Sequence, residues 1–463
     1  MAGRKSGLAR IITASPRRQG DQRLRRPRGP AYQWRTLPAP NVFRHRAFAL
    51  FWASRALQTL AIQVESVAIG WQVYAVARQS LSVERSAFLV GMVGLVQFAP
   101  LFLLTLVAGA IADRVDRRRL VLAMLTVEIV CVLVLAGLAL HPAPSLAPVF
   151  VIAALFGAAR AFQSPASAAM GPMLVPRDEL PRAIAWNSLA WQSGAILGPF
   201  VGGVLVALSA SLAYAGAGLL YLAALLALAL MRADTKPTAR FASGLSAVRE
   251  GLAYVWTNKV VFGAISLDLV AVLLGGATAL LPVYAKDVLH VGAPGFGVLR
   301  AGPPLGAVAI AFWLSRHPLK RRAGHWMLGG VAVYGLATIV FALSTWLPLS
   351  VAALAVLGAG DMLSVNVRQT LVQIVTPDHM RGRVSAVASL FVGASNELGE
   401  FETGVAARVL GPIGAALFGG VGSVFATGLW ALLFPALRKA DRLTDPIPTD
   451  PDGAALAVAN PGG

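Results

Sequence analysis

The chain has 463 residues, of which 57% are hydrophobic and only 13% are charged, and its formal net charge is +19. Soluble domains carry about 25% charged residues, so this composition argues against a water-soluble globular protein. The single cysteine, Cys131, excludes a disulfide framework and a thiolate metal site.

The first 46 residues form a basic segment that we predict to be a disordered cytoplasmic tail. Residues 1–46 hold twelve Lys and Arg residues and one acid, Asp21. Their richness in Pro, Gly, Ser and Gln leaves too little apolar surface to bury in a fold. Water or anionic lipid headgroups explain the charge of this tail better than nucleic acid does. We therefore expect no nucleic-acid partner.

Twelve apolar segments follow the tail, and each is about as long as a membrane-spanning helix, which needs about 20 residues. Backbone polar groups must be paired inside a bilayer, and these segments lack the alternation of barrel strands, so we predict helices. The expected spans are 47–77, 87–112, 119–140, 147–171, 183–208, 211–231, 260–285, 294–315, 324–343, 347–374, 384–407 and 411–434. The sequence thus predicts an all-α membrane protein with twelve transmembrane helices.

The distribution of positive charge predicts the orientation of these spans. If the N-terminus is cytoplasmic, 32 of the 40 Lys and Arg residues lie in cytoplasmic tails and loops. Only four lie in the loops on the other side. Cytoplasmic loops carry an excess of Lys and Arg. We therefore expect a multi-pass membrane protein with both termini in the cytoplasm.

The chain repeats itself at an offset of about 200 residues. The stretch "VPRDELPRA", Val175 to Ala183, has a counterpart in "VTPDHMRGRV", Val375 to Val384. The repeat predicts two pseudo-symmetric six-helix halves, which place a substrate site between them near the membrane midplane. The expected parts are the first half 47–231, a cytoplasmic linker 232–259, the second half 260–434 and a disordered cytoplasmic tail 435–463.

The loop after the second predicted span carries the most informative motif. The stretch "GAIADRVDRRRL", Gly109 to Leu120, is similar to the loop signature G-x-L-A-D-R-x-G-R-K-x-L of the major facilitator superfamily. Together with the two six-helix halves, it makes residues 43–435 resemble that superfamily. The resemblance implies a secondary transporter that works by alternating access, and a gating role for the loop. The matching gating residues are Gly109, Asp113, Arg114, Arg117 and Arg118.

Two features of this loop give specific expectations. Asp116 stands where the family usually has glycine. A carboxylate near a helix N-terminus is stabilised by roughly 0.3–1 kcal/mol. The resemblance implies that Asp113 uses such a contact to hold the two halves together on the cytoplasmic side. The second half has Ser315 at the matching position, so we expect this latch in one half only.

A glycine-rich stretch in the fifth span bears on the direction of transport. The sequence "GAILGPFVGG", from residue 194 to 203, resembles the G-x-x-x-G-P-x-x-G-G element of antiporters in the superfamily. Small residues allow close helix contact, and a proline bends a helix. Simple packing is the alternative interpretation. The matching residues are Gly194, Gly198, Pro199, Gly202 and Gly203.

Ionisable residues inside the spans are the remaining candidates, because such residues are costly in a bilayer and usually face a cavity or a partner. Spans 1, 4, 7 and 10 line the cavity in the superfamily. The candidate proton and substrate residues are Arg55, Gln58, Glu65, Arg160, Asp268, Asp361, Arg368, Glu397 and Glu400. A structural ion pair between Asp361 and Arg368 is the alternative for those two, and Glu128 is expected to be structural.

A proton-carrying acid must change its charge during the cycle, so an acid far from any cation is the better candidate. Asp268 has no basic residue nearer in sequence than Lys259, so we rank it first. Glu65 is second, and the pair Glu397 and Glu400 is third.

The stretches "RAFQSPASAAMGPMLVPRDELPRAIAWNS" and "VQIVTPDHMRGRV" resemble the branch of enterobactin exporters and related drug-efflux proteins. We therefore expect a secondary transporter, a monomer, that exports a siderophore-like or drug-like molecule by proton antiport. An importer or facilitator on the same fold, or a non-transporting membrane receptor or assembly protein, remains an alternative. The sequence has no phosphate-binding loop, no H-E-x-x-H and no Cys/His cluster. We expect neither an enzyme nor a metal or cofactor, with the proton gradient as the energy source.

Overall fold

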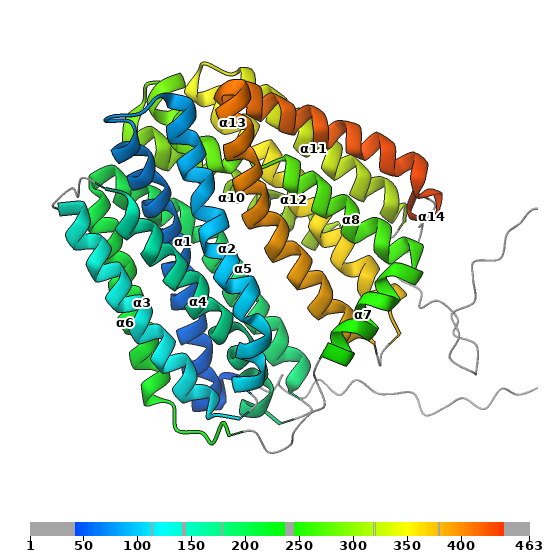
Figure 1. Ribbon diagram of the computed structural model, residues 1–463. Helices are drawn as coiled ribbons and strands as arrows, with labels where there is room; N and C mark the ends of the chain where they lie inside the picture. Colours follow the sequence, from blue (N-terminus) through cyan, green and yellow to red (C-terminus); the bar gives the residue numbers. More distant parts are fainter. Residues whose placement is uncertain are drawn as a thin grey trace, which may run out of the picture. The chain divides into compact units, whose positions relative to one another are not determined.

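The computed structural model of the protein describes residues 42–112, 114–140, 145–176, 179–236, 245–317, 319, 321–377 and 380–438. Almost all residues in these ranges are helical, which confirms the all-α prediction (Figure 1). The tails expected at 1–46 and 435–463 lie outside the described residues up to residue 41 and from residue 439.

Six long helices, which we call the N half, make up the first part of the described chain. They are α1 Arg46–Ala77, α2 Val83–Ala112, α3 Arg117–Leu140, α4 Ala147–Met170, α5 Leu180–Leu208 and α6 Ala210–Leu230. Two short 3-10 helices, η1 Val42–Arg44 and η2 Gly171–Leu174, flank α1 and α4.

The later part begins with a short helix, α7 Leu245–Thr257. The helices that we call the C half are α8 Lys259–Leu274, α10 Gly292–Arg316, α11 Ala323–Leu343, α12 Leu347–Val375 and α13 Arg381–Leu433, which is followed by α14 Pro435–Arg438. Three short segments join α8 to α10, namely η3 Ala277–Leu280, α9 Leu281–Val283 and η4 Tyr284–Val288.

Side-chain caps begin several of these helices where the sequence places a short polar residue. Ser209 Oγ accepts a hydrogen bond from the Leu212 N–H at the start of α6. Asn258 Oδ1 accepts from the N–H groups of Val260 and Val261 at the start of α8. These caps satisfy N–H groups that have no partner inside the helix.

Eleven described helices are long and apolar enough to cross a membrane. The last of them contains two of the twelve expected spans, because α13 consists of two helices joined at Gly411, which has φ 73° and ψ 166°. Only glycine adopts such a conformation readily. Pro412 follows and lacks the N–H that a continuous helix requires.

The seventh expected span is not one continuous helix. In the structure this span runs from Lys259 to Val288. Its first helix, α8, ends at Leu274, and the two residues that follow, Gly275 and Gly276, interrupt the span. Tyr334 of α11 donates a hydrogen bond to the freed carbonyl of Gly275. Non-helical backbone is tolerated at membrane depth only where protein or a cavity satisfies it.

The distribution of exposed and buried residues is that of a membrane protein. Apolar side chains such as Leu103, Phe425 and Leu432 are more than two-thirds exposed, whereas Glu65 and Glu128 are fully buried. A soluble protein rarely exposes large contiguous apolar surface. The bilayer is therefore the solvent for the outer surface, and the polar chemistry lies inside.

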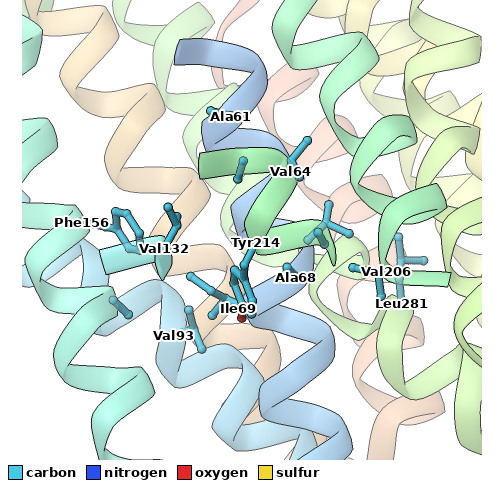
Figure 2. Close-up of a cluster of buried hydrophobic side chains, with 14 of the residues drawn as sticks. Ala61, Val64, Ala68, Ile69, Val93, Val132, Phe156, Val206, Tyr214 and Leu281 are labelled. Atoms are coloured by element: carbon cyan, nitrogen blue, oxygen red, sulfur yellow. The ribbon is translucent and has the colours of Figure 1, made fainter. Parts of the chain in front are cut away.

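Helix α1 lies at the centre of the N half and packs against α2, α5 and α6. Figure 2 shows Ala61, Val64 and Ile69 of α1 among apolar side chains from the neighbouring helices. Leu281 of α9 reaches the same cluster from the C half (Figure 2). The apolar core is therefore continuous between the halves at this point.

The two halves touch along two helix pairs, α2 with α13 and α5 with α10 (Figure 1). A Cβ on Gly203 of α5 would lie 2.4 Å from Gly297 Cα of α10. A Cβ on Gly91 of α2 would lie 2.7 Å from Gly404 Cα of α13. Small residues thus let the backbones meet directly. We call these contacts the seam.

The seam lies toward the end of the bundle that holds the loop between α1 and α2, which we call the predicted outer end. Asp287 of η4 joins the halves at this end. Its Oδ2 accepts a hydrogen bond from the Tyr74 hydroxyl at 2.5 Å, and its Oδ1 lies 2.9 Å from Arg78 Nη2. The predicted outer end is therefore closed by packing and by an ion pair.

Part of the expected linker forms helix α7, which packs against α8 and α13. Tyr254 of α7 donates to the Val375 carbonyl oxygen at 3.0 Å, and Glu250 pairs with Arg383 at 2.5 Å. Helix α7 is thus fixed to the C half.

Candidate functional site

Arg160 of α4 lies at the centre of a buried polar network in the N half. Its Nη2 donates to Glu65 Oε1 of α1 at 2.7 Å, and its Nη1 donates to Gln97 Oε1 of α2 at 2.9 Å. Tyr221 of α6 donates its hydroxyl proton to Glu65 Oε2 at 2.5 Å. Four helices therefore converge on one ion pair, whose charges depend on each other because Glu65 is fully buried.

The network continues to a second carboxylate, Glu128 of α3. Gln163 of α4 donates to Glu128 Oε2 at 2.8 Å, and Gln58 of α1 donates to Gln163 Oε1. Glu128 is fully buried, like Glu65. The expectation that Glu128 is a peripheral structural residue does not fit this position inside the network.

The C half contains a comparable pair between α8 and α12. Arg368 Nη1 lies 3.0 Å from Asp268 Oδ2, and both side chains are almost completely buried. The premise that Asp268 lacks a nearby cation is therefore wrong, because Arg368 comes from another helix. The alternative pairing of Arg368 with Asp361 does not occur either. Asp361 makes no hydrogen bond or ion pair with another residue of the described ranges.

Asp361 and Asp268 face the same small cavity in the C half. Its lining also includes Tyr334 of α11 and Ser364 of α12. The volume is about 10 Å³, which is roughly the space that one water molecule requires. The cavity therefore suits a proton or a single water molecule rather than an organic substrate.

Glu397 and Glu400 lie on α13 where it meets α2. A Cβ on Gly94 of α2 would lie 2.8 Å from the Glu397 carbonyl oxygen and 3.1 Å from Glu400 Cβ. Arg300 of α10 acts electrostatically on Glu400, and Arg160 acts on both acids across the seam. The structure thus places this pair between the halves.

The three candidate residues of α1, namely Arg55, Gln58 and Glu65, do not all join one network. Glu65 binds Arg160, and Gln58 binds Gln163, so both belong to the N-half network. Arg55 makes no ion pair with any carboxylate in the described part of the chain.

The loop between α2 and α3 connects elements of the N half. Arg118 donates from Nε to the Leu228 carbonyl oxygen at 3.0 Å and from Nη2 to that of Ala229 at 2.5 Å. These carbonyls end α6, where a cation is favourable. Arg117 Nη1 lies 2.9 Å from Met173 Sδ of η2.

Gly109 and Arg114 make no comparable contact within the described residues. Arg114 is exposed, and the position of Gly109 has open space for a Cβ. Asp113 lies outside the described residues, so the latch between halves stays a prediction.

Asp116, the departure from the family signature, caps α3. Its Oδ1 accepts from the Arg118 N–H at 3.0 Å and from the Thr235 hydroxyl at 2.6 Å. Partial burial by itself raises the pKa of Asp116, but these hydrogen bonds and the backbone N–H of Arg119 outweigh it and lower the pKa. The carboxylate is therefore ionised and holds the loop against the segment after α6.

The antiporter-like element consists of close contacts along α5. A Cβ on Gly198 would lie 2.3 Å from Gln63 Cβ of α1, while Gly203 meets Gly297 of the C half. Pro199 lies within α5, and Gly194 and Gly202 also face α1. The element therefore has a packing role, and its meaning for the direction of transport stays a prediction.

Gly198→Leu tests the contact between α1 and α5. The leucine meets α1, so we expect the protein to insert normally but to lose about 1–3 kcal/mol in the free energy of unfolding, together with most transport. Thermal unfolding of purified protein and transport assays measure both. Gly137→Leu is the matched control, because a Cβ at Gly137 has open space. Equal stability of the two variants would contradict the packing role.

Sequence reasoning missed several residues of these networks. Gln97, Tyr221 and Tyr334 each hydrogen-bond a network residue or the broken backbone near Asp268. The sequence feature that could have identified them is a polar side chain inside an apolar span. The partner of each one could not be read from the sequence, because the partners come from different helices.

Comparisons with known proteins agree with this architecture. Residues 38–457 match a family model described as transmembrane secretion effector. The enterobactin exporter EntS of Citrobacter koseri is 28% identical over 421 residues, which cover 89% of this chain and 96% of the relative. EntS of Escherichia coli O157:H7 is 26% identical over 417 residues, with 88% and 96% covered.

Solved structures share the fold. The POT family transporter PepTSo matches with a TM-score of 0.65 and 14% identity, covering 85% of this chain and 98% of the other. A D-xylose–proton symporter matches with a TM-score of 0.65 and 12% identity, covering 84% and 97%. At these identities the likeness extends to the fold alone.

Proposed function

Because the chain belongs to the transmembrane secretion effector family of the major facilitator superfamily, we propose that it exports a small organic molecule across the bacterial inner membrane in exchange for protons. The related enterobactin exporters support a siderophore-like substrate, with a drug-like molecule as the other option. The proton gradient supplies the energy, and the protein works as a monomer without a bound cofactor.

The observation that carries the proposal is the Glu65–Arg160 ion pair. It lies inside the bilayer region of a chain related to exporters over most of its length. A buried pair is weak evidence for stability, since well-packed apolar residues often serve as well or better. Ionisable residues at this depth usually mark a substrate or proton pathway. Protonation of Glu65 frees Arg160, which gives the cycle a charge change in the centre of the N half.

Alternating access is supported by where the halves meet. The glycine contacts of the seam and the Asp287 ion pair lie toward the predicted outer end. Opening that end requires these contacts and the apolar packing of Leu281 against the N half to separate, while the packing within each half is retained. This is the rigid-body motion that transporters with repeated halves use.

Everted membrane vesicles from exporter-deficient bacteria test the proposal. Respiration acidifies their interior, so a proton antiporter drives its substrate inward. With enterobactin or ethidium as probe, we expect accumulation that disappears when an ionophore collapses the pH gradient. Vesicles with Glu65→Gln protein are the control and should not accumulate the probe.

Each other outcome names a different function. Equilibration of the probe at the same rate without a pH gradient contradicts antiport and indicates a facilitator. Absence of any protein-dependent movement of either probe contradicts export of both proposed substrate classes.

The proposed orientation gives a separate prediction. A reporter enzyme that works only in the cytoplasm should be active when it is fused after Arg442, because an even number of spans returns the chain to its starting side. A second fusion, after Ser80, should report the opposite side. An external signal from the first fusion would contradict the orientation and with it the direction of transport.

A further inference from the structure

The two halves contain the same set of charges inside the bundle, of which Glu65 and Glu128 are fully buried while Arg160 and Asp361 are partly exposed. In the N half Glu65 and Glu128 surround Arg160, and in the C half Asp268 and Asp361 accompany Arg368. The carboxylate–arginine pair joins the first and fourth spans of each half, α1 with α4 and α8 with α12. The internal repeat of the sequence is therefore present in these charged residues as well as in the loops. Each set contains two carboxylates and one arginine.

In the N half the additional carboxylate is Glu128. It is fully buried, and its Oε2 accepts from Gln163. Its Oε1 has no hydrogen-bond partner among the described residues. Arg160, the cation that acts on it, already donates to Glu65 and Gln97. An ionised carboxylate with an unpaired oxygen is costly at this depth, and protonation of the carboxyl group removes that cost.

In the C half the additional carboxylate is Asp361. Arg368 pairs with Asp268, while Asp361 has no hydrogen bond or ion pair within the described ranges. Both acids face the cavity of about 10 Å³ described above. A proton or one water molecule fits between them. Among the residues that the structure describes, the lining of the cavity contains no charged side chain other than these two acids.

Charge balance decides the state of each set. A charge in a low-dielectric interior is tolerated when it is paired, and a second unpaired carboxylate is neutralised instead. Two carboxylates and one arginine are neutral only when they hold one proton. We propose that, while Glu65 and Asp268 are paired with their arginines as in this structure, each half holds its own exchangeable proton, on Glu128 in the N half and on Asp361 in the C half. The role of these protons in transport rests on the proposed function, but their presence does not.

The groups around each site are consistent with one proton per set. Glu128 is approached by Glu65 and Gln58 from α1, by Arg160 and Gln163 from α4, and by Tyr221 from α6. Asp361 is approached by Asp268 from α8, Tyr334 from α11 and Arg368 from its own helix. The nearby tyrosines add no charge while their hydroxyl groups stay protonated.

Infrared spectroscopy of the purified full-length protein tests the proposal, because a protonated carboxyl group has its own C=O stretching band, which shifts in D2O. The detergent should contain no ester groups. We expect Glu128→Gln and Asp361→Asn each to remove part of this band, and the double variant to remove the sum. Arg160→Met should increase the band, because both acids of its set must then be protonated. The acids Glu397 and Glu400 keep their surroundings in the Glu128 and Asp361 variants and cancel in those differences, whereas Arg160 acts on both of them, so they add to the increase expected for Arg160→Met.

Asp287→Asn is the control and should leave the band unchanged, because Asp287 is ion-paired with Arg78. Melting curves identify any variant that is unfolded, and Asp361→Glu, which keeps the carboxyl group, should retain the C-half contribution. An unchanged band in folded Glu128→Gln or Asp361→Asn would overturn the proton assignment in that half. Failure of the vesicle assay with an intact band pattern would instead count against proton-driven export.

Discussion

Replacement of Arg160 by methionine is expected to cost about 3–5 kcal/mol in the free energy of unfolding and to abolish transport. The substitution leaves Glu65 fully buried with only the Tyr221 hydroxyl as donor. It also removes the donor to Gln97. Thermal unfolding of the purified protein and probe accumulation in vesicles measure the two effects.

The double variant Glu65→Gln/Arg160→Met separates the two losses. It has no Glu65 carboxyl group that must be protonated or left unpaired, so it should recover most of the stability while transport remains absent. Arg160→Lys keeps the charge but cannot donate to Glu65 and Gln97 in the same fork geometry, so we expect an intermediate loss. Wild-type stability of Arg160→Met would contradict the ion pair.

Gly203→Leu is expected to abolish transport while the protein still folds and inserts. A Cβ at this position lies 2.4 Å from Gly297 Cα, so the new side chain separates α5 from α10 at the predicted outer end. The variant should therefore stay open at that end. Gly198→Leu differs because it acts within the N half, where it should lower stability.

Labelling of a buried cysteine measures this opening. Phe296 of α10 is 2% exposed and stacks on Trp71 of α1, with ring centroids 5.2 Å apart. In a Cys131→Ala background, the Phe296→Cys variant should be protected from an impermeant maleimide. It should react with the maleimide when Gly203→Leu is also present. Gly428→Leu is the control, because its Cβ has open space. Continued protection together with normal transport would contradict the seam.

The sequence predicted the spans well because membrane insertion depends on the length and hydropathy of each segment, and both can be read from the chain. It did not predict the break of α8 at Gly275, because hydropathy does not report whether backbone hydrogen bonds continue. The Tyr334 hydroxyl that satisfies this break comes from another helix.

The candidate site was harder to predict for a related reason. Helical periodicity identifies residues on one face of one helix, such as Gln58 and Glu65, and both belong to the N-half network. It does not identify partners on other helices. Arg368 shares a helix with Asp361 but pairs with Asp268 of α8. Glu128 lies on α3, which the resemblance to the superfamily does not place at the cavity, so its position in the network could not be predicted from that resemblance.

Exchange of protons for an organic molecule is the central claim, and its most direct test uses purified protein in liposomes that contain a pH-sensitive dye and the transported probe. When the liposomes are diluted into probe-free buffer, antiport must bring protons inward as the probe leaves. The account predicts acidification of the interior, and none with Glu65→Gln. Alkalinisation of the interior, or release of the probe without any pH change, would contradict it.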